Sequence, residues 1–180
     1  TRVGADDGDT VLDFLRRHQI PHLAASTVVP GVSAAIDVVI GDDRQPHMDH
    51  FVEGVWSSFH LTAEEEAAVR DAETLHAVLV DPVAAEVHRL GELGVLDGVR
   101  VSGDFLDLRH YTLERFAATM QHLTLGFVGW PGDPDDPVVH GLRKVAEDLG
   151  RTLVITLGSR GVLLVVGAAT RFVPVKAVTV

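Results

Sequence analysis

The glycine-rich segment Thr156-Leu-Gly-Ser-Arg-Gly161 carries the strongest chemical signal in this sequence. It follows a β-branched apolar run, and a second apolar run, Val162–Val166, begins directly after it. Two strands joined by such a loop place backbone N–H groups at a strand end, where they can bind a phosphate or a nucleotide. The alternative is an ordinary hairpin turn in which the glycines supply positive φ. An expected place at the carboxyl edge of a parallel sheet favours ligand binding.

The acidic segment Pro131-Gly-Asp-Pro-Asp-Asp136 is a second candidate, between an expected strand and an expected helix. The carboxylates of Asp133, Asp135 and Asp136 could hold Mg²⁺ through water beside a phosphate. The alternative is that they cap the following helix and match the positive end of its dipole. Taken alone, these residues favour the capping role.

Two weaker signals lie elsewhere in the chain. Asp81 comes directly after an expected strand, where its carboxylate could bind a sugar hydroxyl or cap the next helix. His47 and His50 flank Asp49 in a His-x-x-His pattern that could bind a metal. Scattered exposed histidines are the commoner explanation of such a pattern.

Composition narrows the class of protein. The 180 residues are 46% apolar, which is enough for one domain with a buried core. A formal charge of −11 repels a phosphate backbone, so we expect no nucleic-acid partner. Without cysteine the chain has no disulfide, no thiolate metal site and no cysteine nucleophile. No apolar run reaches the roughly 18–20 residues of a membrane span. We therefore expect a cytoplasmic protein with no membrane partner.

The pattern of apolar residues changes near Thr62. Before it, a helix at 9–19 is followed by strands at 22–27, 32–40 and 48–55, with no helix between them. After it, a capping box at Thr62–Glu65 opens a helix, and Glu64–Glu66 should form its solvated first turn. The expected later elements are strands at 75–80, 98–102, 123–128, 153–157, 162–166 and 171–178, and helices at 62–71, 83–93, 113–120 and 137–149.

Alternation of strands and helices at this spacing indicates βαβ units and a parallel sheet. We predict an α/β protein, a three-layer α/β/α sandwich with a mostly parallel sheet and a small β-lid. The core would comprise residues 1–20 and 57–180, and the lid residues 21–56. The last two strands should form an antiparallel hairpin at the edge of the sheet.

The order of these segments resembles the ribokinase family of carbohydrate kinases (PfkB-type) across essentially the whole chain. Only Thr156–Val162, which resembles that family's nucleotide-binding segment, is specific. Four other segments support the resemblance. Val3–Asp7 is similar to an early Val-Gly-x-Asp stretch of the family, and Val29–Ala35 is similar to the start of its lid strand. Pro131–Asp135 is similar to its Asn-x-x-Glu motif for magnesium and phosphate, and Arg171–Val178 is similar to the strand before its catalytic motif. Within the family, Asp43–Phe59 and the following Glu-rich helix are similar to fructoselysine 6-kinases.

The resemblance implies an activity and a set of site residues. A complete member would transfer the γ-phosphoryl group of ATP to a sugar hydroxyl, with ATP and Mg²⁺ as cofactors, a sugar or sugar-amine as substrate and a homodimer through the lid strands. The residues it implies are Thr156, Gly158, Ser159, Arg160 and Gly161 for the nucleotide, Asp133 and Asp135 for the metal, and Asp81 and Ser33 for the substrate.

Three positions depart from the family's motifs. Gly132 stands where asparagine is expected, Asp135 is one methylene shorter than glutamate, and Asp9 stands where glycine is usual. The Asp-Thr-x-Gly-Ala-Gly-Asp motif, with the catalytic base, is expected just after Val180, and the strand with the sugar-binding Gly-Gly region before Thr1. We therefore assign no catalytic residue, expect an internal fragment of a kinase, and predict no activity of the chain alone. The alternative is a non-catalytic relic of the fold that binds nucleotide or sugar.

Overall fold

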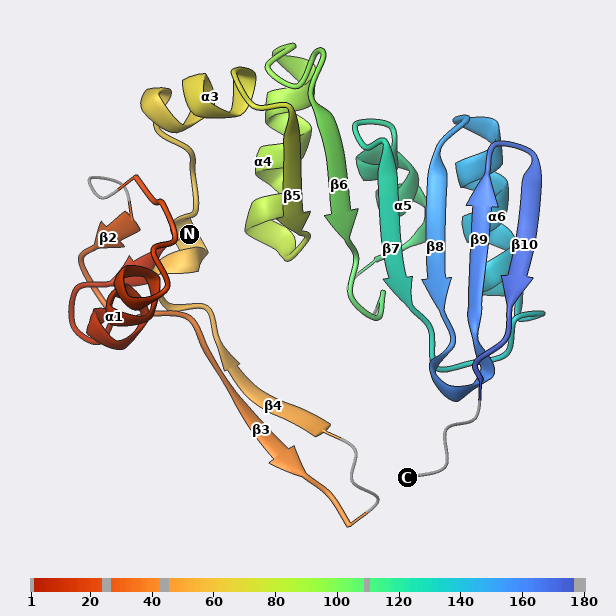
Figure 1. Cartoon of the computed structure of the whole chain (residues 1–180), viewed down its shortest axis with the longest axis horizontal. Coiled ribbons are helices and arrows are strands. Elements are labelled where there is room, and N and C mark those ends of the chain that lie inside the picture. The colour runs from red at the N-terminus through yellow and green to blue at the C-terminus, as the bar shows by residue number, and fades with distance from the viewer. Residues whose placement is uncertain (1, 24–26, 43–45, 109–110, 177–180) are drawn as a thin grey trace. The chain divides into compact units, whose positions relative to one another are not determined.

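The computed structural model describes residues 2–23, 27–42, 46–108 and 111–176. The chain divides into two compact units, Thr1–Glu65 and Glu66–Val180. Figure 1 shows the helices and strands of both units. The predicted grouping of residues 1–20 with the α/β core, with 21–56 as a lid, concerns how the units combine and stays a prediction.

The second unit is built on a six-stranded sheet in the order β10-β9-β8-β7-β6-β5. Its strands are β5 (Thr74–Val78), β6 (Arg100–Asp104), β7 (Leu125–Gly129), β8 (Thr152–Thr156), β9 (Val162–Val166) and β10 (Ala169–Val173). Strands β5 to β8 are mutually parallel, and β9 and β10 add to β8 as an antiparallel hairpin. This confirms the predicted α/β class with its mostly parallel sheet.

Three helices cover one face of this sheet (Figure 1). They are α4 (Asp81–Glu92), α5 (Leu113–Met120) and α6 (Pro137–Asp148), which follow β5, β6 and β7. Alternate strand residues, such as Val101, Ile155 and Val165, are buried on the helix side against side chains such as Phe116 and Leu142. Burial of these apolar surfaces is the main driving force for folding of the unit. No helix among the described residues is long and apolar enough to cross a membrane.

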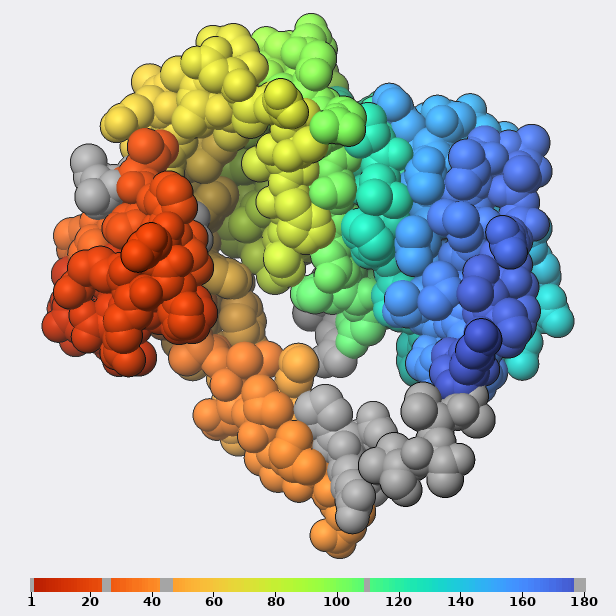
Figure 2. Space-filling model, in the orientation of Figure 1, coloured from red at the N-terminus to blue at the C-terminus, as the bar shows by residue number. Residues whose placement is uncertain are grey.

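The opposite face of the sheet carries the other alternate residues. Strand register places Asp104, Phe127, Val154 and Leu164 in one row across β6, β7, β8 and β9. None of the described helices of this unit lies over that face, and the space-filling view shows its strands in front (Figure 2). The second helix layer of the predicted sandwich is therefore not formed by the described residues of this unit.

The first unit contains short strands and one hairpin. Its elements are β1 (Val3–Gly4), α1 (Asp9–Arg17), β2 (Val28–Val29), β3 (Ala35–Ile40), β4 (Pro46–Val52) and the 3₁₀ turn η1 (Gly54–Ser58). β1 pairs in parallel with β2, and β3 pairs with β4 in an antiparallel hairpin. Every residue of β3 is exposed, so this hairpin contributes little to any core.

Two expected strands of the first unit are wrong in extent. Residues 21–23 are in no regular element, and the backbone N–H of Thr27 donates to Leu23 at 3.1 Å, which is a helical i,i+4 bond. Residues 24–26 lie outside the described ranges. The strand that was expected at 48–55 ends at Val52 in β4. Gly54, at φ 50°, starts the 3₁₀ turn where that strand was expected to continue. Apolar content predicted these strands, but local backbone hydrogen bonds decided the conformation.

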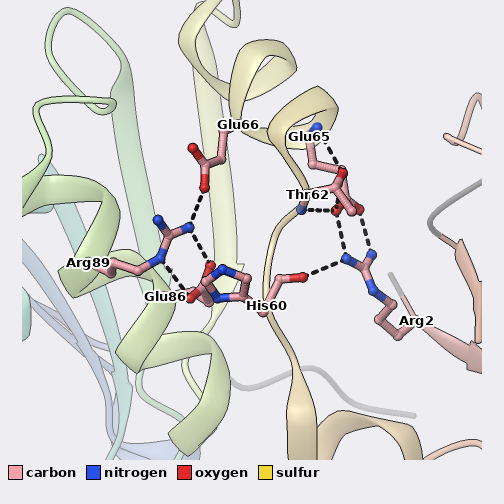
Figure 3. A network of polar contacts seen from close by, with 7 residues as sticks. All are labelled: Arg2, His60, Thr62, Glu65, Glu66, Glu86 and Arg89. Carbon is pink, nitrogen blue, oxygen red and sulfur yellow. Dashed lines mark hydrogen bonds and ion pairs between the residues drawn. The ribbon is translucent and has the colours of Figure 1, made fainter.

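A capping box begins helix α3 (Ala63–Arg70), as predicted. Thr62 Oγ1 accepts from the N–H of Glu65 at 3.3 Å, and Glu65 Oε2 accepts from the N–H of Thr62 at 2.9 Å. Glu65 is not solvated, however: both its oxygens accept from the buried Arg2 guanidinium, at 2.5 and 2.6 Å, and Arg2 also donates to His60 O (Figure 3). The expectation of a solvated first turn was wrong for Glu65, because a distant arginine supplies its counter-charge.

Glu66, the next residue, belongs to a separate network in the second unit. Arg89 of α4 donates to Glu66 at 2.6 Å and to both oxygens of Glu86, at 3.0 and 2.9 Å (Figure 3). Hydrogen bonds to these two carboxylates raise the pKa of Arg89, so the guanidinium stays charged. Adjacent glutamates of one helix are thus held by different arginines.

Candidate functional site

A depression of about 440 Å³ lies at the carboxyl ends of the parallel strands. It is lined by His76, Asp104, Leu106, Phe127, Val128, Gly129 and Thr156. Asp104, Gly129 and Thr156 are the last residues of β6, β7 and β8, so the strands themselves hold them in place. In open α/β sheets ligands bind at this edge, so the depression is the candidate site.

Sequence reasoning missed the polar residues on the β5 and β6 side of this depression. His76 Nδ1 lies 2.9 Å from Ser102 Oγ, and the imidazole meets the ring of Phe127 edge to face at 6.3 Å. Asp104 Oδ1 accepts from the N–H of Leu106 at 2.8 Å, which shapes the turn after β6. The alternation of side chains along a strand could have identified these residues. The predicted strand ended at residue 102, however, and so left Asp104 in a loop.

Thr156 is the predicted nucleotide-binding residue that lines the depression. Its hydroxyl donates to Val128 O at 3.3 Å, and its carbonyl accepts from the N–H of Trp130 at 2.8 Å. These two bonds fix the end of β8 against the loop that follows β7. The other four predicted nucleotide-binding residues, 158–161, follow directly in the connection to β9 and are not part of the lining.

The Gly158–Arg160 segment is a 3₁₀ turn closed by the N–H of Leu157 donating to Gly161 O at 2.8 Å. Gly158 has φ 59°, and a Cβ built there would meet nothing within 4 Å. The glycine is therefore required by backbone conformation and not by lack of space. The turn connects β8 to β9 as a hairpin and also lies at the carboxyl edge of the sheet. The two interpretations of this segment, a hairpin turn and a ligand-binding loop, are therefore compatible.

Arg160 connects the two loops that were predicted to bind the nucleotide and the metal. Its guanidinium donates to the carbonyl oxygens of Pro131 and Gly132. This brings a positive charge and the acidic Asp133–Asp136 turn to the same edge of the sheet. Nothing in the spacing of 131 and 160 indicates this contact, which depends on β7 and β8 being neighbours.

The Asp133–Asp136 turn is ordered by its own carboxylates. Asp136 Oδ2 accepts from Trp130 Nε1 at 2.9 Å and from the N–H of Asp133 at 2.8 Å, and Asp133 Oδ1 accepts from the N–H of Asp135 at 2.9 Å. A Cβ at Gly132 would lie 2.1 Å from Asp136 Oδ2. An asparagine at this position would therefore have to displace the side chains of Asp136 and Trp130. The exposed carboxylates of Asp133 and Asp135 retain oxygens of the kind Mg²⁺ prefers, and their metal role stays a prediction.

Neither of the two predicted substrate residues is part of the lining of the depression. Asp81, the first residue of α4, accepts from Arg115 Nη2 at 2.8 Å, and both side chains are exposed. Ser33 belongs to the first unit, where its hydroxyl donates to Asp7 Oδ1 at 2.7 Å and accepts from the N–H of Gly4 at 2.9 Å. The hydrogen bond from Ser33 lowers the pKa of Asp7. The substrate roles of Asp81 and Ser33 stay predictions.

Among the described residues, no third potential metal ligand converges with His47 and His50. His50 Nδ1 lies 3.2 Å from Asp37 Oδ2 across the β3–β4 hairpin, and both side chains are exposed. In the parts of the chain that the structure describes, the histidines that converge with a third potential metal ligand are elsewhere, at His88 and His122.

Several solved structures share this architecture. A PfkB protein from Polaromonas sp. JS666 matches with a TM-score of 0.72 at 17% identity, over 99% of this chain and 66% of that one. Ribokinase from Thermotoga maritima matches with a TM-score of 0.70 at 16% identity, over 99% and 59%. The chain has a ribokinase-like fold. No protein-family model and no curated protein matches the sequence.

A nucleoside kinase from Burkholderia thailandensis, solved in complex with inosine, matches with a TM-score of 0.69 at 16% identity, over 96% of this chain and 56% of that one. This ribokinase-like chain therefore spans between 56% and 66% of the length of these three structures. At such identities the likeness concerns the fold, which agrees with the predicted resemblance.

Proposed function

We propose that this chain is the nucleotide-binding part of a carbohydrate kinase that uses Mg²⁺ and ATP to phosphorylate a sugar or sugar-amine hydroxyl. The observation that carries the proposal is the contact of Arg160 with the carbonyls of Pro131 and Gly132. It joins a glycine turn and an acidic turn at the carboxyl edge of a ribokinase-like sheet. The same Burkholderia nucleoside kinase is also solved in complex with ADP-inosine, which supports a nucleotide for this fold.

Each turn supplies a different part of the proposed nucleotide site. The Thr156 hydroxyl and the backbone N–H groups of residues 158–161 would bind phosphate oxygens. Arg160 adds positive charge to a chain whose formal charge is −11, which is needed to attract a polyanion. Asp133 and Asp135 would hold Mg²⁺ through water. A bound ion would neutralise charge on the phosphates, and these side chains would hold that ion beside them.

A change at Gly158 tests the nucleotide site. In a Trp56→Phe background Trp130 is the single tryptophan, and its indole bonds to Asp136 beside the site, so its fluorescence should report Mg·ATP binding. Gly158→Val should weaken ATP binding by about tenfold or more, because a β-branched residue at positive φ forces the turn into another conformation.

Gly167→Val is the matched control. Gly167 has φ 54° and equally open surroundings, but it lies in the turn between β9 and β10. The two variants carry the same backbone strain at different places, so ATP affinity should change only with Gly158. Equal ATP affinity in both variants would place the nucleotide elsewhere.

A second candidate function is favoured by Gly132. An asparagine there would have to displace the side chains of Asp136 and Trp130, and the glycine supplies no side-chain ligand, as expected for a nucleotide-binding protein that has lost catalysis. The 180-residue chain should bind Mg·ATP and show no sugar-dependent release of ADP. A longer chain continuing into the Asp-Thr-x-Gly-Ala-Gly-Asp motif would separate the candidates, since turnover supports the kinase and binding without turnover supports the relic.

We also propose a homodimer through the β3–β4 hairpin. The hairpin exposes seven apolar side chains: Ile36, Val38, Val39, Ile40, Met48, Phe51 and Val52. Strand register places Val38 beside Met48, and exposed apolar side chains gathered on one hairpin commonly mark an interaction site. Light scattering should report a dimer that Ile40→Lys converts to a monomer, whereas a monomeric parent protein would rule the proposal out.

A further inference from the structure

Three potential metal ligands converge where the end of α4 meets the residues after α5. His88 Nδ1 and His122 Nε2 are 3.1 Å apart, and His122 Nε2 is 3.7 Å from Glu92 Oε1. All three ligand atoms lie within 4.8 Å of one another. His88 and Glu92 are exposed, and the His122 side chain is 12% exposed. The cluster thus has one nearly buried ligand and two that are open to solvent.

Local structure explains how the cluster forms. His88 and Glu92 are four residues apart on α4, so the helix places them on one face. Gly91 lies between them, and a Cβ there would be 2.1 Å from His122 Nδ1. Glycine inside a helix costs about 0.5–1 kcal/mol relative to alanine. Here the missing Cβ leaves the space in which the His122 ring lies against the helix.

We propose that His88, Glu92 and His122 bind a divalent transition-metal ion of the zinc class. Zn–N bonds of about 2.0–2.1 Å in tetrahedral geometry place neighbouring ligand atoms about 3.3 Å apart. The two separations in the structure, 3.1 and 3.7 Å, lie on either side of that value. Two imidazoles and one carboxylate are a familiar zinc donor set, and water would complete the coordination.

Burial and several neighbouring groups act on the His122 ring. Burial and the nearby His88 lower the pKa of His122. Glu92 attracts a cation and Arg151 opposes one. The Gln121 amide nitrogen lies 3.3 Å from His122 Nε2 and also donates to Ala118 O. This amide group has to move away from the ring nitrogen when a metal binds there. The competing explanation is a simple hydrogen bond between the two histidines.

The position of the cluster indicates a stabilising role. Helix α4 starts at the carboxyl end of β5 and runs back along the sheet, so its last turn lies near the amino ends of the strands. His122 comes three residues before β7 begins. A bound ion would therefore link α4 to the α5–β7 connection at the edge opposite the depression. This inference is independent of the proposed kinase activity.

The test is a titration of the chelator-treated 180-residue chain with ZnCl₂ by calorimetry. We expect one saturable site, a higher melting temperature with Zn²⁺, and visible absorption bands of low-symmetry Co²⁺ when Co²⁺ replaces it. His88→Gln and Glu92→Gln change exposed side chains, so the fold should persist, as circular dichroism would check. Each should weaken Zn²⁺ affinity by about tenfold or more.

His140→Gln is the matched control, because His140 is an exposed histidine of α6 outside the cluster. It should bind Zn²⁺ as the parent chain does. Gly91→Ala should also weaken binding, since its new methyl group displaces the His122 ring. Absence of saturable binding, or equal Zn²⁺ affinity in His88→Gln and the parent chain, would overturn the proposal and leave the histidine–histidine hydrogen bond as the explanation.

Discussion

The two units of this chain are stabilised in different ways. Among the described residues, the first unit contributes only Val3 and Val55 to the buried apolar side chains, and all the others belong to the second unit. In place of a large core the first unit has polar contacts: Arg2 with Glu65, Asp7 with Ser33, and the Trp56 indole with Arg2 O. The second unit depends on side-chain burial between sheet and helices.

The difference has an energetic consequence. A buried ion pair stabilises little relative to an apolar pair of equal volume, but removing one partner leaves a buried charge unpaired. An apolar core loses stability in proportion to the cavity that a substitution leaves. The first unit should therefore be sensitive to single polar substitutions, and the second to loss of buried volume.

The largest effect is expected from Glu65→Ala. It leaves the Arg2 guanidinium, 6% exposed, without its bidentate partner, and it also removes half of the capping box. We expect the first unit to lose about 3–5 kcal/mol of unfolding free energy. In a Trp130→Phe background, Trp56 fluorescence during urea unfolding reports that unit. Val55→Ala is the apolar control, and an equal loss from both variants would contradict the comparison.

A somewhat smaller loss is expected from Leu153→Ala in β8. The side chain is fully buried between sheet and helices, and its removal should cost the second unit about 2–5 kcal/mol. Trp130 fluorescence in a Trp56→Phe background measures this unit. If Leu153→Ala lowers the unfolding free energy of the first unit by the same amount, the two units unfold as one cooperative body. The contrast between the units would then be wrong.

The smallest effect concerns Tyr111, the single tyrosine of the chain. Its hydroxyl donates to Leu79 O at 3.0 Å, and burial raises its pKa to about 12. Because the pKa of Tyr111 in the folded chain lies above the ordinary value of 10.0, the neutral phenol contributes to the stability of the fold. This contribution is complete below pH 10 and is lost as the pH rises toward 12. Ultraviolet titration of tyrosinate in the native chain measures the pKa directly. A value near 10.0 would show that the second unit is looser around Leu79 than the structure has it.

Sequence patterns alone determined the alternating part of the molecule. The helix at 113–120 and the strand at 162–166 match α5 and β9 residue for residue, and the capping box at Thr62 forms as predicted. The places of the segments at 131–136 and 156–161, after β7 and at the end of β8, were also inferred correctly, while their ligand roles stay predictions. These features follow from apolar periodicity and local hydrogen bonds, which involve residues close together in the chain.

Tertiary structure alone decided the contacts between distant residues. Arg2 and Glu65 are 63 positions apart, His88 and His122 are 34 apart, and Arg160 contacts Gly132 across 28. No local pattern encodes such pairs, because they depend on which strands are neighbours and which helix faces meet. Misplacing the end of β6 by two residues was enough to hide Asp104 from the site. The sequence therefore determined the elements and their order, whereas packing decided which charged side chains and which potential metal ligands meet.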